Sequence, residues 1–155
     1  MSRQGRALWL RAALWTLLGW WIGGWALFAF VVAPTAFGAL PSTQVAGRLV
    51  GPVLAALHLY GAGAGFALAL LAWALSRRGF AVWLPLAMSA LCLASHFGVT
   101  ARIEAIRDLV FGPDGNPEVA LRFQHLHRLS MAIYTLVGVG GYALLWVHAR
   151  ADGQT

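Results

Sequence analysis

The sequence predicts an all-α integral membrane protein, an antiparallel four-helix bundle with an amphipathic extension after the third helix. Hydrophobic residues make up 60% of the chain and charged residues 10%, whereas soluble globular domains carry about 25% charged residues. Four apolar runs reach the roughly 20 residues needed to cross a bilayer, and no linker divides the chain. We therefore expect one transmembrane domain over residues 1–155, with spans at about 12–33, 52–75, 80–99 and 127–148.

The first span is an apolar run that follows a positively charged start. Residues 12–33 are about twice as long as a signal-peptide core and lack a small-x-small cleavage site, so we expect a retained helix. This helix should end at Pro34, because proline cannot continue the backbone hydrogen-bond ladder. Gly19 and Gly23 have the small-xxx-small spacing that predicts close helix packing in lipid.

The second helix should start at Ser42, whose hydroxyl can cap the first backbone N–H groups of a helix. It runs to about Ser76 and carries a second pair of helix-packing glycines, Gly61 and Gly65. These glycines do not form a phosphate-binding loop, because no strand precedes them. Residues 77–79 leave room only for a short turn, so the second and third helices should be antiparallel neighbours.

The third span begins near Phe80 and stays apolar to Val99. Over residues 99–110, apolar side chains keep helical spacing, which predicts an amphipathic extension that leaves the membrane or lies on its surface. The charged residues of this extension fall mostly on the other face; they are Arg102, Glu104, Arg107 and Asp108.

The fourth helix follows the clearest loop of the chain, since residues 111–117 are dense in turn formers. It should run from about Pro117, because proline suits a first helical turn, to about Arg150. The polar tail, 151–155, is expected to fray.

The charge pattern also fits a membrane protein. The eleven basic residues are all arginine, set against five acidic ones, and they occur singly or as one pair at the edges of apolar runs. Such flanking charge is typical of transmembrane helices and does not form the dense basic face of a nucleic-acid interface. The positive-inside bias favours cytoplasmic termini, and arginine without lysine points to a GC-rich bacterium, so we expect the bacterial cytoplasmic membrane. The single cysteine, Cys92, predicts a buried thiol.

Counting along the helices brings three histidines to one depth, in the half of the bilayer opposite the termini. They come from three different spans and are His58, His96 and His127. Two further polar residues share this level, Arg128 and Ser130, and two lie just beyond it, Arg102 and His125. This polar cluster, with His127 at its centre, is the candidate functional site.

The cluster allows three interpretations. The side chains can make hydrogen bonds across helices or sit at the headgroup level; His58, His96 and His127 can be ligands of copper or of haem b; or the groups can line a proton or solute path. No catalytic residue is expected, because no carboxylate lies within a span and the sequence around Ser130 offers no group that would stabilise an oxyanion. We expect Arg128 to pair with an acidic residue of the extension, Glu104 or Asp108, or with lipid phosphate. His148 is expected to be solvated.

The motif Phe123-x-x-x-His127-x-Leu129-Ser130 resembles the signature that opens the last helix of the TMEM205-like (DUF4149) family of small four-helix membrane proteins. Arg128 stands where animal relatives have glycine. The resemblance extends to residues 21–24, 37, 40–42 and 100–103. It implies the four-helix architecture and a role for the matching motif residues, but no activity, because the family has no settled one. More distantly, the layout is similar to copper-resistance-D-like membrane proteins and to a four-helix haem-binding oxidase family.

The sequence thus leaves three hypotheses for function. The first is a TMEM205-like membrane protein with a polar His/Arg cluster opposite its termini and no assigned activity. The second is a haem- or copper-binding protein, with redox activity as one outcome. The third is an accessory subunit that packs against a larger membrane complex through the glycine faces of the first two helices. A homo-oligomer is the other assembly considered. In each case the bilayer is a partner and nucleic acid is not.

Overall fold

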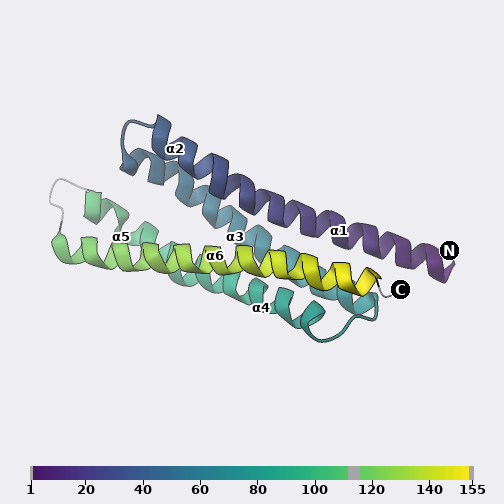
Figure 1. Ribbon diagram of the computed structural model, residues 1–155. Coiled ribbons are helices and arrows are strands. Elements are labelled where there is room, and N and C mark those ends of the chain that lie inside the picture. Colours follow the sequence, from purple (N-terminus) through teal and green to yellow (C-terminus); the bar gives the residue numbers. More distant parts are fainter. Residues whose placement is uncertain (1, 112–115, 154–155) are drawn as a thin grey trace.

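The computed structural model describes residues 2–111 and 116–153 as a bundle of long antiparallel helices, with both ends of the chain at the same end of the bundle (Figure 1). The described residues contain no strand. The elements in chain order are α1 (Arg3–Leu27), the π-helical turn η1 (Phe28–Val32), α2 (Ala33–Ala39), α3 (Thr43–Ala74), α4 (Phe80–Ala94), the π-helical turn η2 (Ser95–Thr100), α5 (Ala101–Phe111) and α6 (Pro117–Gly153). The predicted fold class is confirmed.

Four continuous helical segments are long and apolar enough to cross a membrane: Arg3–Ala39, Thr43–Ala74, Phe80–Phe111 and Pro117–Gly153. Large apolar side chains cover their outer faces, for example Trp20, Phe30 and Val139. So large an apolar surface is unfavourable in water and is the normal surface of a protein in lipid. The chain is therefore an integral membrane protein.

The first helix does not end at Pro34, as the sequence predicts, but continues to Ala39. The Ala33 amide donates to the carbonyl of Phe28, five residues back, so the helix widens into a π-turn just before the proline. Pro34 follows directly after this widened turn, which accommodates its ring within a continuous helix. The extra turns of α2 extend over the half of the bundle opposite the termini.

The other helix ends lie close to where the sequence predicts them. The Ser42 hydroxyl accepts a hydrogen bond from the Val45 amide at 3.2 Å and caps α3. Gly79 precedes α4 with a φ of +62°, a left-handed conformation that suits glycine and permits the short turn between α3 and α4. The predicted loop at 111–117 falls mainly on 112–115, which lie outside the described residues. The tail was expected to fray, but 151–153 continue α6; 154–155 again lie outside the described residues.

Close contact between α3 and α4 depends on the second glycine pair. A Cβ atom on Gly65 would lie 2.5 Å from the carbonyl oxygen of Pro85, and one on Gly61 would lie 3.0 Å from the Cys92 sulfur. Cys92 is a buried free thiol. At Gly19 and Gly23 a Cβ atom would meet nothing within 4 Å, so the close approach expected there is not made among the described residues.

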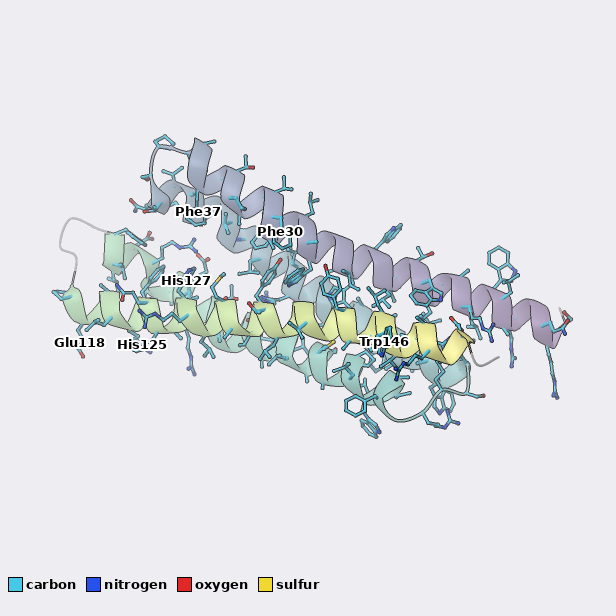
Figure 2. All side chains as sticks on the ribbon, in the orientation of Figure 1. Phe30, Phe37, Glu118, His125, His127 and Trp146 are labelled. Atoms are coloured by element: carbon cyan, nitrogen blue, oxygen red, sulfur yellow. The ribbon has the colours of Figure 1, made fainter. Side chains whose placement is uncertain are left out.

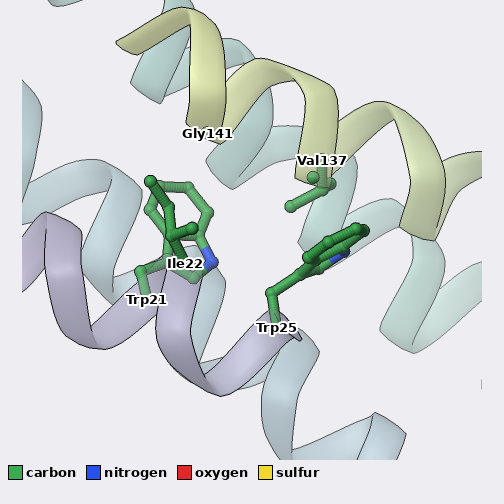
Figure 3. Close-up of a pocket in the computed structure, with 6 residues that line it drawn as sticks. Trp21, Ile22, Trp25, Val137 and Gly141 are labelled. Carbon is green, nitrogen blue, oxygen red and sulfur yellow. The ribbon is translucent and has the colours of Figure 1, made fainter. Parts of the chain in front are cut away.

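The contact between α1 and α6 is built on tryptophan. Figure 3 shows Trp21, Ile22 and Trp25 of α1 beneath Val137 and Gly141 of α6. Trp25 Nε1 donates to the carbonyl oxygen of Tyr134 at 2.9 Å, and Tyr134 Oη donates to the carbonyl oxygen of Trp25 at 2.5 Å. The two rings also stack, with centroids 5.2 Å apart. This reciprocal pair fixes the point at which α1 enters η1.

Candidate functional site

A cavity of about 390 Å³ lies in the half of the bundle opposite the termini. In this half α2 packs on α3, whereas α6 packs on α5 and η2, so the first and last helices diverge (Figure 1). Small residues keep the space open: Ala29 and Ala33 face it from the first helix, and Gly47 and Gly51 face it from α3. The rest of its wall is mainly apolar, with Phe28 and Leu54 among the lining residues.

Among the described residues, Arg107 of α5 is the charged residue that lines this cavity. It is buried, and its Nη2 atom lies 2.7 Å from Oε1 of Glu104, one turn earlier in α5. A Cβ atom on Gly51 would lie 2.6 Å from Arg107 Nη2 and 2.8 Å from Glu104 Oε1. The ion pair therefore rests against the bare backbone of α3. The sequence places Arg107 off the apolar face of the extension; the structure instead buries it together with Ile103, four residues earlier.

His127 and Ser130 line the cavity from α6, one helical turn apart. Ser130 is buried, whereas His127 is exposed and its ring stacks on Phe123 at a centroid distance of 6.2 Å. Phe123 in turn meets Phe111 of α5 edge to face. Figure 2 labels His127 on α6 and Phe37 on α2, which line the cavity from its two sides.

The remaining basic residues of the predicted cluster lie outside the cavity wall. Arg102, His125 and Arg128 are exposed. The ion pair expected between Arg128 and the extension is made by other arginines: Glu104 pairs with Arg107, and Asp108 lies 3.3 Å from Nη2 of Arg48.

His58 and His96 form a second polar site, inside the bundle. His58 of α3 is buried and lies close enough to His96 of η2 for the two rings to interact electrostatically. Among the described residues, neither ring nitrogen of His58 has a hydrogen-bond partner in the protein. His127 does not join this pair: in the described part of the chain, no three His, Cys, Asp or Glu side chains come together as a group that could hold a metal ion.

A third polar group, at the terminus end, was not predicted. The Asp152 carboxylate accepts a hydrogen bond from Trp15 Nε1 at 2.9 Å, lies 3.4 Å from Arg11 Nε and pairs with Arg77. Arg77 also hydrogen-bonds Nδ1 of His148. We call Arg11, Trp15, Arg77, His148 and Asp152 the terminal clasp, because it joins α1, the turn after α3 and α6.

Two properties of the terminal clasp differ from the expectation. His148 is fully buried, not solvated, because the turn after α3 covers its face of α6. The signal in the sequence was the four-residue spacing of His148 and Asp152, which puts both on one face. Burial lowers the pKa of the Arg77 guanidinium from its usual value; Asp152 acts in the opposite direction, and Arg11 lowers it further.

Comparison with known proteins gives one family. A family model described as "Domain of unknown function (DUF4149)" matches residues 16–110, which is more than half of the chain. Comparison with curated proteins and with solved structures gave no match. The matched region runs from α1 into α5 and so contains Gly51 and Arg107, while His127 and Ser130 of α6 lie beyond it.

Proposed function

The chain belongs to the DUF4149 family, a domain of unknown function, and from the geometry of its cavity we propose that it binds an amphiphilic small molecule within the membrane. The observation that carries this proposal is the cavity of about 390 Å³ with Arg107, His127 and Ser130 in its otherwise apolar wall. Ligand sites of roughly 300–1,000 Å³ with apolar walls and a few converging polar groups are typical of small-molecule binding. The cavity is at the lower end of this range.

The proposal uses part of the polar cluster expected from the sequence. His127 and Ser130, which match the TMEM205-like motif, are its polar groups on α6, and Arg107 is their partner on α5. We do not assign His58, His96, Arg102, Arg128 or His125 to the ligand, because they do not line the cavity. The role is that of a binding protein and requires no catalytic group.

The haem and copper alternatives have less support. Among the described residues one histidine lines the cavity of about 390 Å³, and the space beside His58 is about 10 Å³. Such a space is enough for about one water molecule and not for a macrocycle. The accessory-subunit alternative would use the open face of α1 around Gly19 and Gly23, and a lipid-facing helix has the same appearance.

A cavity-filling substitution tests the proposal. A Cβ atom on Gly47, which lines the cavity, would meet nothing within 4 Å, so Gly47→Leu should fill the space without displacing the backbone. The matched control is Gly63→Leu, at an equally open but exposed position of the same helix. Binding of a dansyl-labelled medium-chain fatty acid to the purified protein would be followed by fluorescence.

We expect Gly47→Leu to weaken this binding by about tenfold or more, because the added side chain occupies the apolar area that the ligand would bury. Gly63→Leu should leave it unchanged, and both variants should keep the wild-type melting temperature to within a few degrees. Absence of binding to the wild-type protein, or equal binding by wild type and Gly47→Leu, would contradict the proposal.

A further inference from the structure

We propose that the ligand is a single-chain amphiphile with a carboxylate headgroup, that Arg107 is its counter-ion, and that Glu104 occupies this arginine until the ligand binds. This inference rests on the proposed function of the cavity and adds the chemical class of the ligand and the residue that selects it. It follows from the charges, the exposed surfaces and the close contacts around Arg107.

The first step concerns charge. Arg107 is buried in a helix long and apolar enough to span the membrane, and a guanidinium there requires an anionic partner. Glu104 is the carboxylate within ion-pair distance among the described residues, and its side chain is 43% exposed whereas that of Arg107 is 11% exposed. Glu104 can therefore turn out toward the headgroup region, whereas Arg107 stays in the wall of the cavity. Because Arg107 stays in place while Glu104 can move away, Arg107 can exchange the carboxylate of Glu104 for the carboxylate of a ligand.

The second step concerns the headgroup. A guanidinium has five N–H donors in a planar fork and binds a carboxylate through two parallel hydrogen bonds. His127 and Ser130 line the same cavity and can donate further hydrogen bonds. Among the described lining residues Arg107 is the one that is always cationic, so a monoanion balances the site, and a dianionic phosphate monoester would be left with excess negative charge.

The third step concerns the chain of the ligand and its path. Phe37 of α2 and Met131 of α6 line the cavity, and yet 46% and 51% of their surfaces are exposed. The cavity thus reaches the lipid-facing surface between the first and last helices, where a molecule dissolved in the bilayer can enter sideways. Its volume of about 390 Å³ suits one acyl chain and not a complete two-chain phospholipid.

The fourth step distinguishes this exchange from a structural ion pair. If Glu104 only stabilises α5, its removal should weaken ligand binding or leave it unchanged. If Glu104 competes with the ligand for Arg107, its removal should strengthen the binding of a carboxylate. Opposite effects of substitutions at the two members of one ion pair are therefore the signature of the proposed exchange.

The experiment compares three probes with the same chain and dansyl label: a fatty acid, the corresponding alcohol and the corresponding alkyl phosphate. They are titrated into purified wild-type protein and three variants, Arg107→Gln, Glu104→Gln and, as control, Arg102→Gln, which changes an exposed arginine of the same helix. The wild type should prefer the acid to the alcohol by about tenfold or more, as expected for a hydrogen-bonded charge. Arg107→Gln should abolish this preference, Glu104→Gln should raise the affinity for the acid severalfold, and Arg102→Gln should change neither.

The outcomes separate this inference from the proposed function. If no probe binds the wild type, the proposed function itself fails. If acid and alcohol bind equally, and Arg107→Gln changes neither, the cavity binds apolar chains and the assignment of a carboxylate ligand is overturned. If the wild type binds the phosphate more tightly than the acid, the assignment of a carboxylate headgroup is wrong. If Glu104→Gln binds the acid more weakly than the wild type, the proposed exchange of Glu104 for the ligand is wrong. Binding of the alcohol serves as the folding control for each variant, because it requires an intact cavity but no charge.

Discussion

Asp152 combines donors from two segments far from it in the sequence, at the terminus end of the bundle: Arg11 and Trp15 of α1, and Arg77 in the turn after α3. Arg77 is nearly buried, and a buried guanidinium that loses its carboxylate is left with an uncompensated charge. Asp152→Asn keeps the shape of the side chain and removes this charge. We expect it to lower the free energy of unfolding by about 1–3 kcal/mol, the usual cost of an unsatisfied buried polar group.

The measurement is thermal or denaturant unfolding in detergent, followed by circular dichroism. Asp108→Asn is the matched control, because its carboxylate pairs with an exposed Arg48 and is itself mostly exposed. Exposed ion pairs contribute little, so this variant should unfold like the wild type. Equal destabilisation by both substitutions would show that the terminal clasp has no special role.

At the same scale, the sequence predicts the depth of a residue better than its direction. Helix rise puts His58, His96 and His127 at one level, but the sequence left open whether the rings converge; in the structure His58 lies near His96, and His127 lines the cavity. Rise along a helix depends only on counting, but rotation about its axis depends on which helices are its neighbours. Arg107 was missed for the same reason: its acidic neighbours suggest a solvated face, whereas its guanidinium lies against Gly51 of α3, and α5 packs on α6.

At the scale of elements, two π-helical turns lie within the first and third spans. The turn at η1 lets the first helix pass Pro34, and α2 then forms part of the cavity wall. Helix starts at Ser42, Phe80 and Pro117 could be predicted because capping and proline rules act locally. The continuation of the first helix past Pro34 could not be predicted, because the rule for proline considers only neighbouring residues. It does not include a wider helical turn stabilised by tertiary contacts.

The contact of α1 with α6 gives a prediction about this element pair. A Cβ atom on Gly138 would overlap the indole ring of Trp25, which its hydrogen bond to Tyr134 and its stacking on that ring hold in place. Gly138→Ala should therefore push α1 away from α6 and cost about 1–3 kcal/mol, as overpacking usually does. The shift should also change the environment of the Trp25 indole ring, and a change in the intensity or wavelength of tryptophan fluorescence would report it.

Gly19→Ala is the control for this prediction, since a Cβ atom there meets nothing within 4 Å. Alanine favours a helix over glycine, so this variant should be as stable as the wild type or more so. A wild-type melting temperature for Gly138→Ala would contradict the packing. Loss of an oligomer in Gly19→Ala, by size-exclusion chromatography, would instead show that the open glycine face of α1 contacts a second chain.

For the whole molecule, the two ends of the bundle are built differently. At the terminus end the terminal clasp joins the first and last helices, and at the opposite end these helices diverge around the cavity (Figure 1). The ion pairs and packing at the terminus end hold the helices together. The helices can therefore separate around a cavity at the opposite end without sliding past one another. The leaflet from which a ligand comes is then decided by the orientation of the protein.

Orientation can be tested by labelling single cysteines, because the native Cys92 is buried and should react poorly. Arginine flanks the terminus end slightly more often than the other, and with termini in the cytoplasm the cavity would face the outer leaflet. Ser2→Cys should then be protected from a membrane-impermeant maleimide in spheroplasts, and Asn116→Cys should be labelled; both should react after lysis. The reverse pattern would place the cavity in the inner leaflet. In that case a carboxylate amphiphile made in the cytoplasm would reach Arg107 without first crossing the bilayer, whereas the expected orientation requires a ligand that arrives from outside or has already flipped.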